Sequence, residues 1–309
     1  MADQRADQRA TRPHTQRTDP ARRPLRGQHM IVGLLHPGRM GAAIGARLTT
    51  AGHTVLWCPT GRSPASAERA RTAALAPVDD LTELTARATT IVSICPAHVA
   101  VSLAETVAQH GFTGLYIDAN ATKPTTMRSI RAAFDDSSDV IDAVISGPPP
   151  TAETGPRIYL AGPAPAAARA YDLFISAGLT TTNLGERLGA ASALKMATAS
   201  YSRTTRLLAA LAHGLADAHG VTDALIAEAH ELGAKPLADR GYLPSVAARA
   251  WRWQQEMVDV ADTLTDADLP AGLAAASAQL FECLAAEKDN FSIAPEAVIA
   301  RLRTPTAPN

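Results

Sequence analysis

The glycine spacing near the start of the sequence is suited to binding phosphate. An apolar run, 30–35, is followed by His36, Gly38 and Gly41, and then by small and apolar residues at helical spacing. A strand, a tight turn and a helix N-terminus leave free N–H groups that favour a pyrophosphate. The usual fingerprint is G-x-G-x-x-G, and His36 replaces its first glycine, so an ordinary strand-to-helix turn is the alternative. The residues expected at the cofactor are Gly33, His36, Pro37, Gly38, Arg39 and Met40.

A polar turn after the second short strand bears on the choice between the two nicotinamide dinucleotides. It lies about 20 residues past the glycines, where the residue that reads the adenosine ribose belongs. An NAD site uses an Asp or Glu there, but no acidic residue occurs between Thr49 and Glu68. Thr60, Arg62 and Ser63 instead suit a 2′-phosphate, through charge-assisted hydrogen bonds. The turn therefore predicts NADP(H) as the cofactor, with a solvated polar turn as the alternative.

Lys195 is the strongest candidate for a catalytic group. It is one of four lysines in a chain with 25 arginines, and no other charged residue occurs in 188–201. Hydride transfer from a nicotinamide to a carbonyl produces an alkoxide, and a lysine ammonium in a dry site can supply the proton that the alkoxide needs. Arginine cannot, because its guanidinium does not deprotonate. We therefore predict that Lys195 is the general acid, the alternative being a surface or salt-bridged lysine.

The order of the expected elements indicates how these residues are positioned. Strands and helices alternate from Met30 to about Thr182, which predicts an α/β fold with a Rossmann-like, doubly wound, mostly parallel sheet. After Leu184 the stretches are helical. We therefore expect an NADP-binding Rossmann domain over 29–183 and an all-α domain, for substrate binding and dimerisation, over 184–309. The expected strands are 30–35, 54–58, 90–95, 114–118, 139–145 and 157–161.

Residues at the ends of two expected strands would face a ligand, because ligands of such sheets bind at the carboxyl ends of the strands. Cys95 and Pro96 end one strand and would lie beside the cofactor. Asn120 follows another, where it would bind the nicotinamide ribose or the substrate, and a turn-forming role suits it equally. The cysteines and histidines show no metal-ligand spacing, so we expect no metal site.

Composition limits the remaining function classes. The formal net charge is −1, so nothing suggests nucleic acid or a membrane surface as a partner. No run of about 18 apolar residues occurs, so we expect no transmembrane helix. Three cysteines, an odd count, without a secretory signal favour a cytoplasmic protein. Residues 1–28 are rich in arginine and nearly free of apolar residues, which predicts a disordered N-terminal tail.

The glycine-containing turn at 36–41, the turn around Arg62 and the helical second half resemble the β-hydroxyacid dehydrogenase superfamily. Its members include 3-hydroxyisobutyrate dehydrogenases, 6-phosphogluconate dehydrogenases and imine reductases. The resemblance covers nearly all of 30–290 in segment order. Residues 142–147, Asp-Ala-Val-Ile-Ser-Gly, are similar to the substrate motif D-A-P-V-S-G-G, and 189–195 are similar to the catalytic helix G-x-G-x-x-x-K. A poorly characterised 6-phosphogluconate dehydrogenase-like branch looks most similar.

The resemblance implies roles for individual residues. Ser146 and Gly147 would anchor the substrate, and Lys195 stands at the position of the catalytic lysine. Thr198 is one of two residues that replace the family's substrate-binding asparagine, and it can donate one hydrogen bond to the substrate. The same resemblance implies a homodimer that associates through the helical domain.

Three departures from the family pattern remove polar groups that would hold a substrate. Ala199, the second residue at the asparagine position, offers nothing polar, and Gln255 stands where the family has a late lysine. Pro148 replaces the second glycine of the substrate motif and has no N–H. We therefore expect a substrate that is less anionic than a simple hydroxyacid, or one that is held differently. We do not expect 6-phosphogluconate, because its phosphate needs a basic cluster.

These features together predict an NADPH-dependent oxidoreductase that transfers hydride to or from a small organic carbonyl or alcohol. Two alternatives remain open at this point. One is an imine reductase, although in that group another residue usually replaces the lysine. The other is a non-catalytic NADP-binding module, which the missing asparagine and glycine favour and the presence of Lys195 disfavours.

Overall fold

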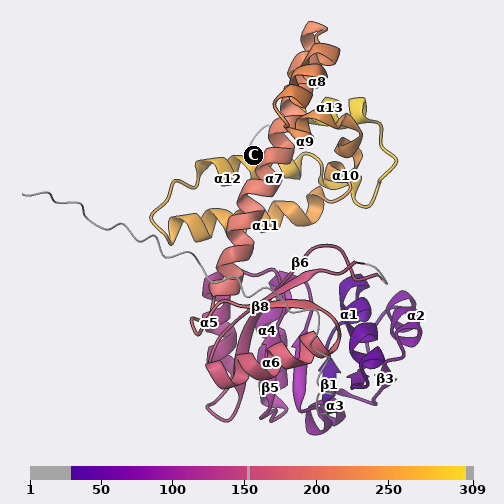
Figure 1. Cartoon of the computed structure of the whole chain (residues 1–309), viewed down its shortest axis with the longest axis vertical. Helices are drawn as coiled ribbons and strands as arrows, with labels where there is room; N and C mark the ends of the chain where they lie inside the picture. The colour runs from indigo at the N-terminus through magenta and orange to yellow at the C-terminus, as the bar shows by residue number, and fades with distance from the viewer. Residues whose placement is uncertain (1–28, 152–153, 304–309) are drawn as a thin grey trace, which may run out of the picture.

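The computed structural model describes residues 29–151 and 154–303, so the expected tail, 1–28, lies outside the described residues. A sheet flanked by helices forms one end of the molecule and a group of helices forms the other, with the long helix α7 running from one part into the other (Figure 1). No helix among the described residues is long and apolar enough to span a membrane.

Eight strands form a single sheet in the order β3-β2-β1-β4-β5-β6-β7-β8. All neighbouring strands are parallel except β6 and β7, which pair antiparallel. This arrangement confirms the expected doubly wound, mostly parallel sheet. The strands are β1 (Ile31–Leu34), β2 (Thr54–Trp57), β3 (Ala76–Pro77), β4 (Thr90–Ser93), β5 (Leu115–Asp118), β6 (Asp139–Ser146), β7 (Arg157–Ala161) and β8 (Thr180–Asn183).

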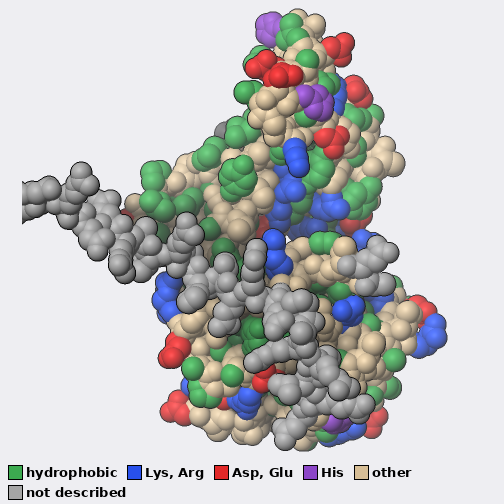
Figure 2. All heavy atoms as spheres, viewed as in Figure 1, with side chains coloured by type: hydrophobic (Ala, Val, Ile, Leu, Met, Phe, Trp, Pro, Cys, Tyr) green, Lys and Arg blue, Asp and Glu red, His purple; other side chains and the backbone are tan. Residues whose placement is uncertain are grey.

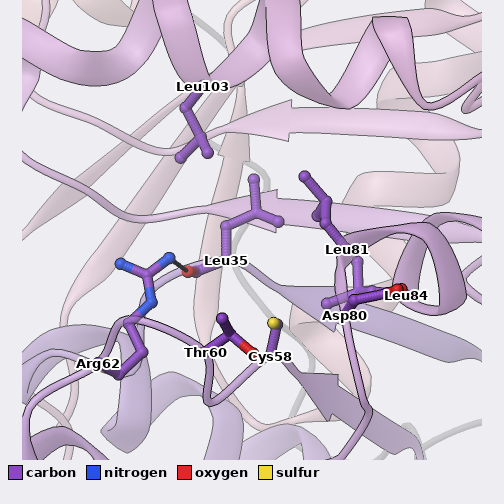
Figure 3. A pocket seen from close by; sticks show the side chains of 8 residues that line it. All are labelled: Leu35, Cys58, Thr60, Arg62, Asp80, Leu81, Leu84 and Leu103. Carbon is purple, nitrogen blue, oxygen red and sulfur yellow. Dashed lines mark hydrogen bonds between the residues drawn. The ribbon is translucent and has the colours of Figure 1, made fainter.

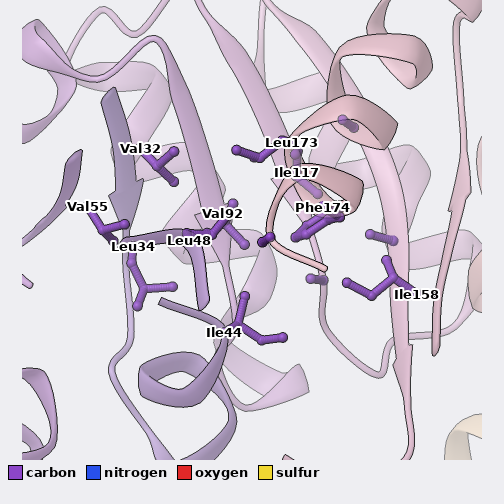
Figure 4. Packing of buried hydrophobic residues seen from close by; sticks show 14 of the residues in the cluster. Val32, Leu34, Ile44, Leu48, Val55, Val92, Ile117, Ile158, Leu173 and Phe174 are labelled. Atoms are coloured by element: carbon purple, nitrogen blue, oxygen red, sulfur yellow. The ribbon is translucent and has the colours of Figure 1, made fainter. Parts of the chain in front are cut away.

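Helices cover both faces of the sheet because its central strands are apolar on both sides. Val32 and Leu34 of β1 pack with Ile44 of one covering helix and Phe174 of another (Figure 4). A second buried cluster, which includes Tyr116 and Ile130, fills the opposite face. The helices of this part are α1 (Arg39–Thr50), α2 (Pro64–Thr72), α3 (Leu81–Arg87), α4 (Ala100–Gln109), α5 (Pro124–Ala133) and α6 (Ala164–Ser176), with a 3₁₀ turn, η1 (Ala97–Val99).

The part after β8 is helical, as expected, and packs around its own core. Met196 and Leu207 of α7 meet Trp253 and Met257 of α11 and Phe281 of α12 in that core. The elements are α7 (Ala190–His219), α8 (Thr222–Glu231), α9 (Lys235–Ala238), α10 (Leu243–Ala247), α11 (Ala250–Thr265), α12 (Gly272–Glu282) and α13 (Pro295–Arg303), with 3₁₀ turns η2 (Arg240–Tyr242) and η3 (Ala285–Glu287).

The N-terminus of α7 is held against the sheet by a buried carboxylate. Asp142 of β6 is fully buried and accepts hydrogen bonds from the backbone N–H of Ser192 at 2.9 Å and from its hydroxyl at 2.7 Å. The first residues of a helix have N–H groups without an intrahelical partner, and a negative charge there is favourable. Asp142, a residue of β6, therefore caps the N-terminus of α7, a helix of 30 residues, and fixes the point at which that helix leaves the sheet.

A second buried carboxylate lies beside the first. Asp118 of β5 is in register with Asp142 of β6. It accepts hydrogen bonds from the side-chain amide of Asn120 at 2.7 Å and from its backbone N–H at 3.2 Å. Burial raises the pKa of Asp118 to about 7, the hydrogen bonds from Asn120 oppose that rise, and the charge of Asp142 adds to it. The folded protein therefore holds a proton on Asp118 at a pH where an unfolded chain has lost it.

We expect Asp118→Asn to change how stability depends on pH. Between the ordinary Asp pKa of 3.8 and about 7, only the folded state holds the Asp118 proton. Its contribution to the free energy of unfolding is therefore complete below pH 3.8 and falls as pH rises to 7, by up to about 1.4 kcal/mol per pH unit. The variant does not titrate at this position, so it does not lose this contribution. The difference between its free energy of unfolding and that of wild type, measured with urea, should therefore shift in favour of the variant between pH 4 and 7. Parallel profiles would contradict the assignment.

Candidate functional site

The turn between β1 and α1 has the shape of a phosphate cradle. A Cβ on Gly41 would lie 2.1 Å from the carbonyl oxygen of His36, so only glycine permits this tight turn. A Cβ on Gly38 would meet nothing within 4 Å, which leaves open space over the turn. Gly38 is the N-cap of α1, and no side chain caps this helix. The free N–H groups of its first turn therefore face that space, and they suit a pyrophosphate.

Two arginines reach the cradle from the region after β2. Arg62 donates to the ring Nδ1 of His36 at 2.8 Å and to the carbonyl oxygen of Leu35 at 2.9 Å. Arg69 of α2 donates to the carbonyl oxygen of Pro37 at 3.1 Å. Burial lowers the pKa of His36, and the charges of Arg62 and Arg69 lower it further. His36 is therefore a neutral acceptor, and the turn carries two cations that favour a phosphate.

A pocket lies at the carboxyl ends of β1 and β2, beside the cradle (Figure 3). Its volume is about 260 Å³. Leucine side chains line most of it, and Arg62 and Thr60 stand at one side. In sheets of this topology the adenosine half of a dinucleotide binds at this position. The lining residues are Leu35, Cys58, Thr60, Arg62, Asp80, Leu81, Leu84 and Leu103.

The other residues expected at the cofactor are placed around the same edge, with local roles of their own. Thr60 donates to the carbonyl oxygen of Asp79 at 3.3 Å, and Ser63 is the N-cap of α2. Arg39 is exposed as the first residue of α1, and Met40 packs on the sheet core. Pro96 precedes η1 and is exposed.

Asn120 is engaged within the protein rather than facing a ligand. It is 3% exposed, and its carbonyl oxygen accepts from the backbone N–H of Cys95 at 2.5 Å. Its amide donates to Asp118 and, at 3.2 Å, to Ser93. Of the two roles considered from the sequence, this geometry favours the turn-forming one. Burial raises the pKa of the Cys95 thiol to about 11, so Cys95 is an inert side chain beside the cradle.

Lys195 lies one turn past Ser192 on α7, close to the sheet. Its ammonium is 3.4 Å from Oε1 of Glu256, and the two side chains are 18% and 10% exposed. The other oxygen of Glu256 accepts from Nε of Arg203 at 2.7 Å. Burial raises the pKa of Glu256, but the charges of Lys195 and Arg203 outweigh burial and hold the pKa below its usual range. Lys195 is therefore a salt-bridged lysine, in a partly dry position that an acid–base group requires.

The residues expected to anchor the substrate lie on two elements that pack together, β6 and α7. Ser146 is the last residue of β6 and is partly buried. Gly147 follows with φ +127°, a conformation that favours glycine. The hydroxyl of Thr198 is exposed but donates to the carbonyl oxygen of Lys195 at 3.0 Å. Ser146 and Gly147 thus remain open to a ligand, whereas Thr198 already has an acceptor.

Several site residues were missed from the sequence. Glu256 is the ion-pair partner of Lys195 but comes 61 positions later, and no local pattern joins the two. Asp80, the N-cap of the short helix α3, and Leu84 of that helix also line the pocket. The sequence does contain a pattern that marks the start of this helix. Asp80 accepts from the N–H of Glu83 at 2.8 Å, and Glu83 accepts from the N–H of Asp79 at 2.9 Å. This reciprocal capping pattern marks a helix start.

No group of three or more His, Cys, Asp or Glu side chains among the described residues is placed to hold a metal ion. A bound nicotinamide dinucleotide would fit the cradle and the pocket, since the open space over Gly38, the uncapped α1 and Arg62 all favour its phosphates.

Solved structures share this fold. The 3-hydroxyisobutyrate dehydrogenase of Mycobacterium tuberculosis, with L-serine, is 21% identical with a TM-score of 0.73, over 89% of this chain and 100% of that one. The Salmonella typhimurium 3-hydroxyisobutyrate dehydrogenase is 16% identical with a TM-score of 0.67, over 88% and 99%. An imine reductase from Myxococcus stipitatus with NADP+ is 17% identical with a TM-score of 0.54, over 89% and 100%. At these identities the likeness shows the fold alone.

Comparison with protein-family models identifies the family, which the shared fold does not. No curated protein matches the sequence. Residues 216–284 match a domain of unknown function. Residues 31–185 match the NAD binding domain of 6-phosphogluconate dehydrogenase, which spans the whole sheet, the cradle and the pocket. The chain therefore belongs to the family that carries the NAD binding domain of 6-phosphogluconate dehydrogenase, and 6-phosphogluconate dehydrogenases are among the members of the superfamily that the sequence resembles.

Proposed function

We propose that the protein is an NADPH-dependent oxidoreductase of the β-hydroxyacid dehydrogenase type, acting on a small organic carbonyl or alcohol. The observation that carries this proposal is the placement of Lys195. Asp142 fixes the start of α7 at the edge of the sheet, and Lys195 follows one turn later with its side chain 18% exposed. When bound at this edge, the nicotinamide supplies or accepts the hydride. Lys195 donates or removes the proton at the substrate oxygen.

The preference for NADPH rests on charge at the ribose end of the pocket. Arg62 lines the pocket, and Arg69 stands beside the same turn. Asp80 also lines the pocket, but its carboxylate caps α3 through the N–H of Glu83. A carboxylate that is already engaged at a helix start is poorly placed to accept from a ribose hydroxyl. A 2′-phosphate, in contrast, meets the free donors of Arg62.

Arg62→Ala should weaken NADPH binding by roughly 1.5–3 kcal/mol, the usual contribution of a charge-assisted hydrogen bond. NADH binding should hardly change, because NADH lacks the 2′-phosphate. Fluorescence titration with each cofactor measures both affinities. Arg71→Ala, which removes an exposed arginine paired with Glu68 on α2, is the matched control and should bind both cofactors as wild type does. Equal losses for NADPH and NADH in Arg62→Ala would refute the NADPH preference.

The role of Lys195 predicts a separation between turnover and cofactor binding. Lys195→Met keeps the length and apolar stem but removes the proton, so turnover should fall by about 10²–10⁴-fold. NADPH affinity should stay within about twofold of wild type, because the lysine acts on the substrate. Lys195→Arg keeps the charge beside Glu256 but holds its proton, so it should be nearly as inactive.

Single-turnover NADPH oxidation with a panel of aldehydes, ketones and cyclic imines tests this prediction. An active Lys195→Arg variant would show that charge alone matters. Full activity of Lys195→Met on imines would favour imine reduction with another donor. Binding of NADPH by the wild type without turnover of any carbonyl or imine would favour the non-catalytic module.

We further propose that the protein is a symmetric homodimer that associates through α7. One face of this helix exposes apolar side chains one and two heptads apart, at Tyr201, Leu208 and Leu215, which are 77%, 54% and 65% exposed. Leu211, at 40%, extends the stripe. An apolar stripe of this length on a helix is typical of a surface that packs against another helix. A two-fold interface pairs the stripe with its own copy.

Light scattering at micromolar concentration should give twice the mass of the chain. Leu208→Glu combined with Leu215→Glu places two like charges on the stripe of each copy, so this variant should be monomeric with unchanged helix content by circular dichroism. A matched control, Leu232→Glu, changes an exposed leucine beyond α8 and should stay dimeric. A monomeric wild type would contradict the proposal.

A further inference from the structure

Two arginines of the helical part, Arg203 and Arg206, lie against the ring of Trp253, and two more, Arg249 and Arg252, are close enough for their charges to act within the same group. Arg203 and Arg206 lie on α7, Arg249 precedes α11, and Arg252 lies on α11. Arg206 is close enough to Arg203 and Arg249 for their charges to lower its pKa, an effect that adds to burial. Burial and the charges of Arg249 and Arg203 likewise lower the pKa of Arg252. These four residues are called the arginine cluster below.

The arginine cluster has fewer negative charges than positive ones. Glu256 pairs with Arg203 but shares its charge with Lys195. Arg206 donates at 3.2 Å to the carbonyl oxygen of Ser202, an acceptor that carries no negative charge. Arg249 donates to the carbonyl and hydroxyl oxygens of Ser245. Arg252 is exposed, its guanidinium makes no hydrogen bond or ion pair with the described residues, and the charges of Glu256 and Asp289 favour its charged form. Like charges that lie close together repel, and an anion that joins them removes that repulsion.

Aromatic rings lie against three of these guanidiniums. That of Arg249 is 4.9 Å from the ring centre of Phe291. The guanidinium carbon of Arg203 lies 4.5 Å from the ring centre of Trp253. Arg206 lies 4.9 Å from the ring centre of Tyr242 and 5.5 Å from that of Trp253. Stacking fixes the plane of a guanidinium and leaves the N–H groups on its edge free to donate. The arrangement is therefore organised in advance for the oxygens of a carboxylate or a phosphate.

The arginine cluster continues the face of α7 that carries Lys195. Arg203 comes eight residues after Lys195, a rise of about 12 Å along the helix. The single carboxylate of Glu256 spans both side chains, at 3.4 Å from Lys195 and 2.7 Å from Arg203. Lys and Arg side chains gather where the helical part overhangs the sheet part (Figure 2). A ligand that reaches Lys195 from the carboxyl ends of the strands would therefore meet Arg203, which shares Glu256 with Lys195, next along α7.

We propose that the arginine cluster binds an anionic group, a carboxylate or a phosphate, at the end of the substrate opposite its reacting carbon. The proposal rests on the proposed role of Lys195. It also explains why Pro148, Ala199 and Gln255 can stand where the superfamily has substrate-binding polar groups, because the substrate is anionic but is held differently from a simple hydroxyacid. The substrate is then a carbonyl compound with several atoms between its carbonyl and its anionic group. Because the structure brings four arginines together, the lack of a basic cluster no longer argues against a phosphorylated substrate.

Binding is tested first, without turnover. Glutarate and inorganic phosphate are titrated into the NADPH complex at constant ionic strength, with Trp fluorescence as the signal, because Trp253 contacts the arginine cluster. Wild type should bind at least one of them, and Arg252→Gln and Arg206→Gln should each weaken that binding about tenfold. Arg128→Gln, which changes an exposed arginine on α5, is the matched control and should bind as wild type does. No saturable binding by wild type, or equal binding by all variants, would overturn the proposal.

Turnover is tested second, with 5-oxopentanoate, an ω-phosphorylated aldehyde of similar length, and uncharged pentanal. Wild type should prefer a charged aldehyde over pentanal by at least tenfold in kcat/KM, and the preferred charge identifies carboxylate or phosphate as the ligand. Arg252→Gln should lose most of this preference and Arg252→Lys should keep part of it. Equal kcat/KM for all three aldehydes would overturn the proposal while leaving the oxidoreductase assignment intact. Arginine-dependent anion binding without any turnover would support the subsite and reject the proposed reaction instead.

Discussion

The contact between the Asp142 carboxylate and the N-terminus of α7 determines the geometry of the rest of the molecule. It joins the sheet to a helix of 30 residues, which at 1.5 Å per residue is about 45 Å long. Lys195, the arginine cluster and the exposed apolar stripe all lie on that helix or against it. A tilt of about 5° at its base would move its far end by about 4 Å. The two hydrogen bonds from Ser192 to Asp142 therefore fix the direction of the whole helix. A carboxylate is suited to holding a helix N-terminus because it accepts from several donors at once.

Placing that carboxylate beside Asp118 has an energetic cost, which explains the polar network around both. Two neighbouring buried carboxylates repel if both are ionised. Burial raises the pKa of both carboxyls, and a proton that Asp118 holds below about pH 7 reduces that repulsion. Asn120 joins Asp118 to Ser93 and to the N–H of Cys95. Asn120 thus ties the carboxyl ends of β4 and β5 together beside the cradle.

The sequence predicted the features that a clear local pattern marks, and missed those with a weak local pattern or those that depend on residues distant in the chain. Buried parallel strands such as β1 and β4 are continuous apolar runs, and they were found within one or two residues of their ends. β3 has two residues and β8 is mostly threonine, so neither shows such a run and both were missed. The break between α10 and α11, at Ala248 and Arg249, could not be predicted, because no proline or glycine marks it. Lys195 stood out because its neighbours carry no charge. Its partner Glu256 did not, since only tertiary packing brings α11 against α7.

Net charge was the least informative part of the sequence, and the structure shows why. A sum near zero rules out a strong overall field, but recognition of an anion depends on charge within a few ångströms. Six arginines lie at two places along the proposed ligand path, with Arg62 and Arg69 at the cradle and the arginine cluster on α7 and α11. Much of the balancing acid lies on exposed surfaces, as in the pair of Glu68 with Arg71. An anionic cofactor and an anionic substrate would therefore each meet a local cation site, and Lys195 would lie between them on the face of α7 that both approach.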